Sequence, residues 1–176
     1  REYIHVRKGR VLAERYLGVG ETDFQKIIET IFEEQPDFIF NALIGDSSYA
    51  FFEQFRQACE ARGINQTERF PIASCNLSEP DLTEIMPECR NGHISSSVYF
   101  STLTNPENRC FVAEYNQAFP DGPPPAAAGE AAYIATILLG RAIAAANTTD
   151  PILVRNAVAG MRLQAPQGLV TIDPET

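Results

Sequence analysis

Groups that can form hydrogen bonds lie at or near the ends of three apolar segments of the chain. The segments are residues 38–44, 70–73 and 93–100, and the residues of interest are Gly45, Asp46, Ser47, Cys75, Asn76 and Tyr99. Together they offer a carboxylate, a hydroxyl, an amide, a thiol, a phenol and the accessible backbone of a glycine. Convergent polar groups of this kind are typical of a site that holds a small polar ligand.

The three segments must be neighbouring strands if these groups are to meet. Residues 38–44 form an apolar run that stops at Gly45, which predicts a strand buried on both faces of a parallel sheet. The carboxyl ends of such strands share one edge of the sheet, where open α/β sheets bind their ligands. There is an alternative: Asp46 or Ser47 only caps a helix, and Tyr99 only packs between sheet and helix.

Catalytic and metal-binding signatures are absent from the sequence. It contains no G-x-S-x-G, Walker A, G-x-G-x-x-G or H-E-x-x-H pattern, and only two histidines. The four cysteines form no Cys-x-x-Cys pair, so no metal site is expected and buried free thiols are the default interpretation. We therefore predict a protein without catalytic residues, metal or cofactor, and not an enzyme.

Strand and helix patterns alternate along the chain, which predicts an α/β fold with a parallel sheet. Strands are expected at residues 11–17, 38–44, 70–73, 93–100 and 168–172. Helices are expected at residues 24–32, 49–59, 78–86, 105–119, 126–146 and 151–159. Thr22 and Gln25 have the spacing of a capping box, and Asn105 followed by Pro106 has the pattern of an N-cap and first helical residue.

The composition limits the classes of partner. The chain has 176 residues and a net charge of −9, which disfavours binding to a nucleic-acid backbone. The longest uncharged helical candidate, residues 131–140, is too short for a bilayer, so no membrane insertion is expected. The chain opens on what looks like the end of a helix and stops just after a strand, so we expect both ends to be truncated.

Several segments, in order and spacing, resemble one family. They are residues 45–52, 71–74, 99–101, 105–108, 130–133, 138–141, 165–168 and 170–174. They resemble the type I periplasmic solute-binding proteins, above all those that serve ABC importers of urea, short-chain amides or branched-chain amino acids. They are also similar to the amide-sensing negative regulator of an amidase operon.

The resemblance implies a three-layer α/β sandwich that forms one lobe of a two-lobed protein. Residues 1–124 would belong to the second ligand-binding lobe, and residues 125–176 would be helices and a strand returning towards the first lobe. The implied ligand contacts are the turn at Gly45, Asp46 and Ser47, the turn at Cys75 and Asn76, and, less directly, Tyr99.

The same resemblance implies a function and leaves an alternative open. The main expectation is a periplasmic solute receptor that closes around an amide, urea or amino acid and delivers it to an ABC permease. The alternative is a cytoplasmic amide-sensing regulator that binds a partner protein. Asp46 resembles the transporter branch, whereas residues 71–74 are closer to the regulator. Cys75 and Asn76 depart from the regulator, which has small hydroxyl residues there.

Overall fold

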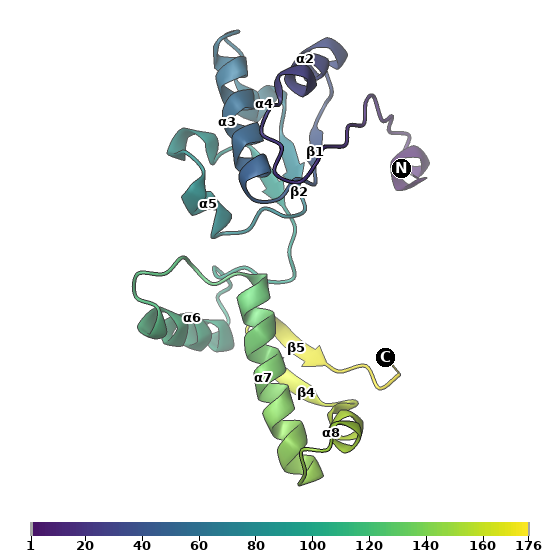
Figure 1. Ribbon diagram of the computed structural model, residues 1–176, viewed down its shortest axis with the longest axis vertical. Helices are drawn as coiled ribbons and strands as arrows, with labels where there is room; N and C mark the ends of the chain where they lie inside the picture. Colours follow the sequence, from purple (N-terminus) through teal and green to yellow (C-terminus); the bar gives the residue numbers. More distant parts are fainter. Residues whose placement is uncertain (1, 176) are drawn as a thin grey trace. The chain divides into compact units, whose positions relative to one another are not determined.

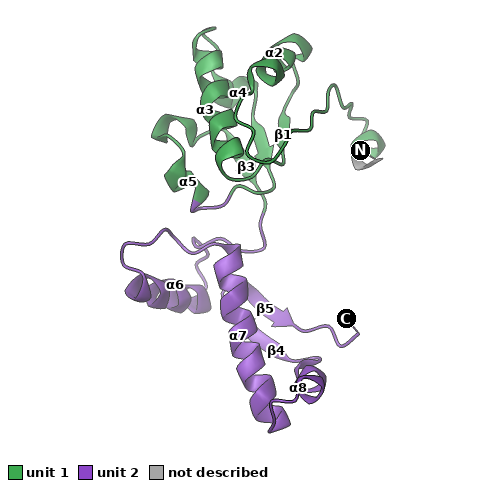
Figure 2. Ribbon diagram, in the orientation of Figure 1, with its two compact units in different colours: residues 1–77, 81–96 green, residues 78–80, 97–176 purple. Residues whose placement is uncertain are grey.

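The computed structural model describes residues 2–175 and divides the chain into two compact units (Figure 2). Unit 1 comprises residues 1–77 and 81–96, and unit 2 comprises residues 78–80 and 97–176. The predicted lobe boundaries, residues 1–124 and 125–176, concern the whole protein and stay a prediction.

Unit 1 is built from short strands and the helices between them (Figure 1). Its helices are α1 (Glu2–Val6), α2 (Gln25–Glu34), α3 (Asp46–Glu60), α4 (Gln66–Arg69), α5 (Asp81–Glu84) and the 3-10 helix η1 (Pro87–Cys89). Its strands are β1 (Ile39–Asn41), β2 (Ile72–Ser74) and β3 (His93–Ser95). The strands form one parallel sheet in the order β1-β2-β3, which confirms the predicted parallel α/β arrangement.

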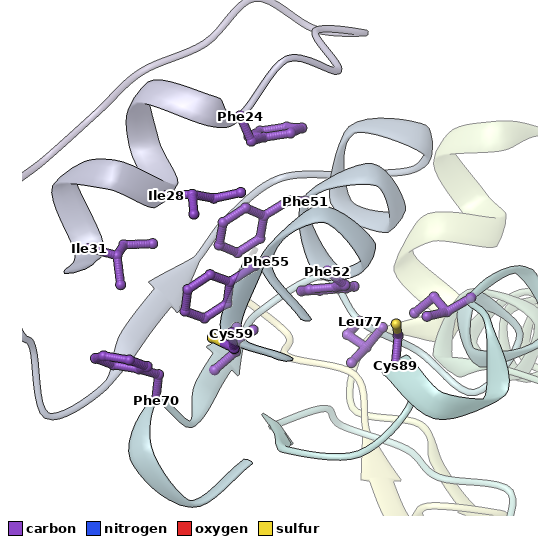
Figure 3. Close-up of a cluster of buried hydrophobic side chains, with 12 residues drawn as sticks. Phe24, Ile28, Ile31, Phe51, Phe52, Phe55, Cys59, Phe70, Leu77 and Cys89 are labelled. Atoms are coloured by element: carbon purple, nitrogen blue, oxygen red, sulfur yellow. The ribbon is translucent and has the colours of Figure 1, made fainter. Parts of the chain in front are cut away.

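The core of unit 1 is an aromatic cluster between α2, α3 and the sheet (Figure 3). Phe24 and Phe55 are fully buried, and the ring of Phe55 stacks on Phe51 with centroids 5.7 Å apart. Ile72 of β2 joins the same cluster. The helical spacing of apolar residues in segments 24–32 and 49–59 therefore predicted the right packing faces.

The opposite face of the sheet is open within the described residues. Phe40 of β1 is 67% exposed, and Ile94, two strands away in the same register row, is 61% exposed. The prediction that residues 38–44 are buried on both faces is therefore wrong here, because α2 and α3 cover only one face. The strand is also shorter than predicted, because its ladder begins at Ile39 and ends at Asn41.

Other local predictions need correction. Residues 11–17 form no strand, and Tyr16 in this segment is 85% exposed. Thr22 is not an N-cap: α2 begins at Gln25, and the Asp23 carboxylate accepts the Gln25 N–H instead. The strand predicted over residues 93–100 ends at Ser95, where pairing with β2 ends. The helix predicted from residue 78 to 86 is reduced to α5 because Pro80 and Pro87 bracket it.

Unit 2 contains three helices and a β-hairpin. The elements are α6 (Pro106–Ala118), α7 (Ala127–Ala146), α8 (Pro151–Val158), β4 (Arg162–Ala165) and β5 (Gly168–Thr171). Asn105 caps α6 as predicted, since its side chain accepts the Asn108 N–H at 2.8 Å. Strand β4 was not predicted, and it pairs antiparallel with β5, so the last strand does not join the parallel sheet.

Helix α7 is longer than the uncharged stretch that the sequence suggested. It continues through Glu130 and Arg141 to a length of 20 residues, and by length and composition alone it could cross a membrane. Core helices of other folded proteins can have the same length and apolar composition. In unit 2 its residues Ile134 and Leu138 form a buried cluster with Leu163 of the hairpin. This packing favours a helix that belongs to a folded domain.

Candidate functional site

The ends of the three parallel strands form a polar row. Asn41, Ser74 and Ser95 are aligned in the register of β1, β2 and β3. Asn41 is only 5% exposed, and its amide donates to the hydroxyls of Ser48 at 3.1 Å and Ser74 at 3.4 Å. Its Oδ1 accepts the Leu43 N–H at 3.0 Å. Asn41 therefore fixes the end of β1, the first turn of α3 and the end of β2 together.

The two turns predicted to bind ligand are held side by side. The Cys75 N–H donates to the Asn41 carbonyl at 3.3 Å, and the Asn76 amide donates to the Ala42 carbonyl at 3.1 Å. Asn76 and Cys75 are themselves exposed. The structure thus brings together five of the six predicted residues, Gly45, Asp46, Ser47, Cys75 and Asn76, at the carboxyl end of the sheet.

The first turn of α3 presents an exposed carboxylate and a buried hydroxyl without a partner among the described residues. Gly45 precedes the helix, and Asp46 is its first residue and is exposed. Ser47 is only 3% exposed, yet its hydroxyl has no hydrogen-bond partner within the described residues. A buried hydroxyl without a partner is costly. A ligand at the start of α3 could supply that partner. The N–H groups of Ser48 and Tyr49 already donate to the Gly45 carbonyl, which leaves those of Asp46 and Ser47 for a ligand.

Tyr99 lies in unit 2 and serves a different set of contacts. It is 2% exposed, and its hydroxyl donates to Asn108 Oδ1 at 2.7 Å. Burial, with help from the charges of Glu79 and Glu130, raises the pKa of Tyr99 to about 12. The phenol is therefore neutral at physiological pH and is engaged inside unit 2.

Four hydrogen-bonding residues of the strand ends were not among the six predicted ligand contacts: Asn41, Ser48, Ser74 and Ser95. The Ser95 hydroxyl donates to the Leu77 carbonyl at 2.7 Å, which ties β3 to the second turn. Asn41 carried a usable signal, because it is the one polar residue of the run over residues 38–44. A polar residue in a buried strand needs internal hydrogen-bond partners. Here those partners are Ser48 and Ser74, which lie at the strand-end site.

No group of acidic, histidine or cysteine side chains in residues 2–175 could hold a metal ion. All four cysteines are free, with Cys59 and Cys89 buried and Cys75 and Cys110 exposed. Burial raises the pKa of Cys59 to about 11, so its thiol stays protonated. The site therefore offers hydrogen-bonding groups, one carboxylate and the exposed thiol of Cys75.

The backbone at Gly45 makes a testable contribution to the site. Its φ of 55° and ψ of −139° lie in a region that residues with a Cβ avoid. Replacing Gly45 with alanine should lower the free energy of unfolding by about 1–3 kcal/mol, measured by urea denaturation. A Cβ at Gly45 would meet no atom within 4 Å, so the loss would come from the backbone alone.

Gly140 in α7 provides the matched control for this prediction. A Cβ there also meets no atom within 4 Å, but the backbone is helical. Alanine at Gly140 should therefore stabilise the protein by about 0.5–1 kcal/mol. Equal effects of the two substitutions would contradict the strain that we assign to Gly45.

A short parallel sheet with helices between its strands, and polar turns at the strand ends, defines one lobe of a type I periplasmic binding protein. The family model described as "Periplasmic binding protein domain" matches residues 1–176. The chain belongs to this family.

Solved structures of ABC-transporter solute-binding proteins have the same fold. One from R. palustris, in complex with benzoate, superposes with a TM-score of 0.80 at 21% identity, covering 96% of this chain and 44% of that chain. One from Rhodopseudomonas palustris HaA2, in complex with p-hydroxybenzoic acid, has a TM-score of 0.79 at 26% identity, covering 99% and 47%. A leucine-binding protein from Thermotoga maritima has a TM-score of 0.71 at 24% identity, covering 88% and 42%.

The chain thus spans less than half the length of each of these three relatives. The first two were solved in complex with benzoate and p-hydroxybenzoic acid, and the third is a leucine-binding protein. These proteins are solute-binding proteins rather than enzymes.

Proposed function

We propose that this chain is part of the solute-binding component of an ABC importer, with an amide, urea or a branched-chain-type amino acid as its ligand. The family match and the likeness to ABC solute-binding proteins support the general role. The partner would be the membrane-embedded permease, and the location would be the periplasm. We also propose that the protein has no catalytic activity and needs no metal or cofactor.

One observation supports the ligand class: the exposed carboxylate of Asp46 is next in sequence to Ser47, whose buried hydroxyl has no hydrogen-bond partner in the described residues. A carboxylate at the start of α3 favours ligand N–H groups, whether of an amide, of urea or of the ammonium group of an amino acid. The Ser47 hydroxyl and the first N–H groups of α3 can donate to a ligand carbonyl. Urea and short amides have both features in one small molecule.

The remaining predicted residues complete the proposed site. Asn76 and Cys75 would form the second wall, because the Cys75 backbone N–H and the Asn76 side-chain amide are tied to the end of β1. We propose that Tyr99 acts through the segment it fixes, since its hydroxyl is already donated to Asn108. Binding would be coupled to hinge closure. The ligand would bind one lobe, bridge to the other and shift the population towards the closed form.

A thermal-shift screen of the full-length protein tests this proposal. The panel is urea, acetamide, butyramide, leucine, benzoate and 4-hydroxybenzoate. Stabilisation by an amide, urea or leucine supports the proposed ligand class. Stabilisation by the benzoates alone would overturn it, and so would a flat response to the whole panel.

The cytoplasmic amide-sensing regulator is the second candidate. All four cysteines are free, which is the usual state in a reducing compartment. Fractionation of cells that express the full-length gene separates the two proposals. Recovery in the periplasmic fraction supports the importer component, and recovery in the cytoplasm supports the regulator.

A further inference from the structure

A groove of about 380 Å³ lies between α6 and α7 in unit 2, and none of its lining residues belongs to the strand-end site of unit 1. It is lined by Phe111, Glu114, Tyr115, Phe119, Gly129 and Tyr133. The first four residues come from or directly follow α6, and the last two are one turn apart on α7. The volume falls within the range of small-molecule sites.

Four aromatic rings form most of the groove wall. Phe111 and Tyr133 have ring centroids 4.7 Å apart with planes tilted by 45°, and Tyr115 and Phe119 are 5.0 Å apart with planes tilted by 48°. Neither pair is stacked face to face. Phe111 is only 5% exposed and also contacts Tyr99, so the accessible rings are those of Tyr115, Tyr133 and Phe119. The face of an aromatic ring carries negative electrostatic potential, which attracts cations.

Glu114 is the one charged residue among those that line the groove. Glu114 lies within α6, and its side chain makes no hydrogen bond or ion pair with another residue in the described part of the chain. Its charge nevertheless acts on the groove: after burial, it is the next largest cause of the raised pKa of Tyr133. A carboxylate beside several aromatic rings, without a cation of its own, is complementary to a positively charged ligand.

We propose that this groove is a binding site for a small alkylammonium cation. The aromatic rings would surround the methylated or methylene-bearing surface of the cation, and Glu114 would supply the counter-charge. The groove shares no residue with the proposed solute site, so either proposal can fail without the other.

Gly129 gives the proposal a sharp structural test. A Cβ at this position would meet no atom within 4 Å, so glycine leaves open space in the groove wall. A leucine there would project into the groove without a clash at its Cβ. Gly140 lies on the same helix, outside the groove, and also has no atom within 4 Å of an added Cβ. Gly129→Leu and Gly140→Leu therefore form a matched pair.

The experiment is an NMR titration of the purified protein with choline, followed at the backbone amides of Glu114 and Tyr133. A parallel titration uses 3,3-dimethylbutan-1-ol, which has the shape of choline with a carbon in place of the charged nitrogen. We expect choline to bind about tenfold more tightly than the neutral alcohol. Gly129→Leu should abolish choline binding, Glu114→Gln should weaken it about fivefold, and Gly140→Leu should leave it unchanged.

Each other result overturns the proposal. No shift with choline would mean that the groove is an ordinary gap between two helices. Equal binding of choline and the alcohol would mean an apolar pocket without selectivity for charge. Loss of binding in Gly140→Leu, or its retention in Gly129→Leu, would place the cation elsewhere.

Discussion

Replacing Asn108 with alanine is expected to lower the free energy of unfolding by about 3–5 kcal/mol, the largest effect of any single polar substitution considered for this chain. Asn108 is 1% exposed. Its Oδ1 accepts the Tyr99 hydroxyl at 2.7 Å, and its amide donates to the carbonyls of Ser101 at 2.8 Å and Leu103 at 2.7 Å. Alanine would leave the buried Tyr99 hydroxyl and two carbonyls without this partner.

Asn116, on the same helix, provides the control for Asn108. It is exposed, and its replacement by alanine should change the free energy of unfolding by less than about 0.5 kcal/mol. Urea denaturation of both variants measures the difference. A loss below about 1 kcal/mol in Asn108→Ala would show that water replaces these hydrogen bonds easily.

Replacing Glu130 with glutamine should stabilise the protein at neutral pH. Glu130 in α7 is fully buried; its Oε1 accepts the Gln167 N–H at 3.3 Å, and its Oε2 has no partner in the described residues. Burial raises the pKa of this carboxyl, and the Gln167 hydrogen bond only partly opposes the rise. The folded protein therefore holds the Glu130 proton more tightly than the unfolded chain does.

The sign of the pH dependence follows from linkage. Since the folded pKa exceeds the unfolded one, Glu130 contributes no penalty at pH values below the ordinary glutamate range. Its contribution to stability falls as pH rises from that range up to the folded pKa, and then stays constant. Each unit of pKa difference is worth about 1.4 kcal/mol.

Chemical unfolding between pH 4 and pH 8 tests this prediction. The advantage of Glu130→Gln over the native chain should be small at pH 4 and should grow with pH. The same change at the exposed Glu60 should leave the pH profile as it is. Parallel pH profiles for the native chain and Glu130→Gln would contradict a buried, proton-holding carboxyl.

Much of the site's location could be predicted from the sequence, because it depends on local patterns. The apolar run ending at Gly45 predicted a strand followed by a polar turn, and the structure places α3 directly after that turn. The alternation of strands and helices predicted that the turns at Asp46 and Asn76 share one sheet edge, and hydrogen bonds from Cys75 and Asn76 to the end of β1 hold them there.

What could not be predicted depends on contacts between distant residues. Asn41 resembled one polar interruption in an apolar strand, and its role appears only when Ser48 and Ser74 are brought beside it. Residues 11–17 have a strand-like pattern, yet a strand needs a neighbour and none of the described residues pairs with them. The exposed faces of Phe40 and Ile94 likewise depend on what covers the sheet, which no local pattern specifies.

The most direct test of the central claim is calorimetric titration of the full-length protein with the ligand that gives the largest thermal shift. Native protein is compared with Asp46→Ala and with Glu60→Ala, which removes an exposed carboxylate at the far end of the same helix. We predict that Asp46→Ala weakens binding of an amide, urea or amino acid at least about tenfold, whereas Glu60→Ala binds like the native protein. Unchanged affinity in Asp46→Ala would show that Asp46 only begins helix α3, and it would contradict a solute site at this strand end.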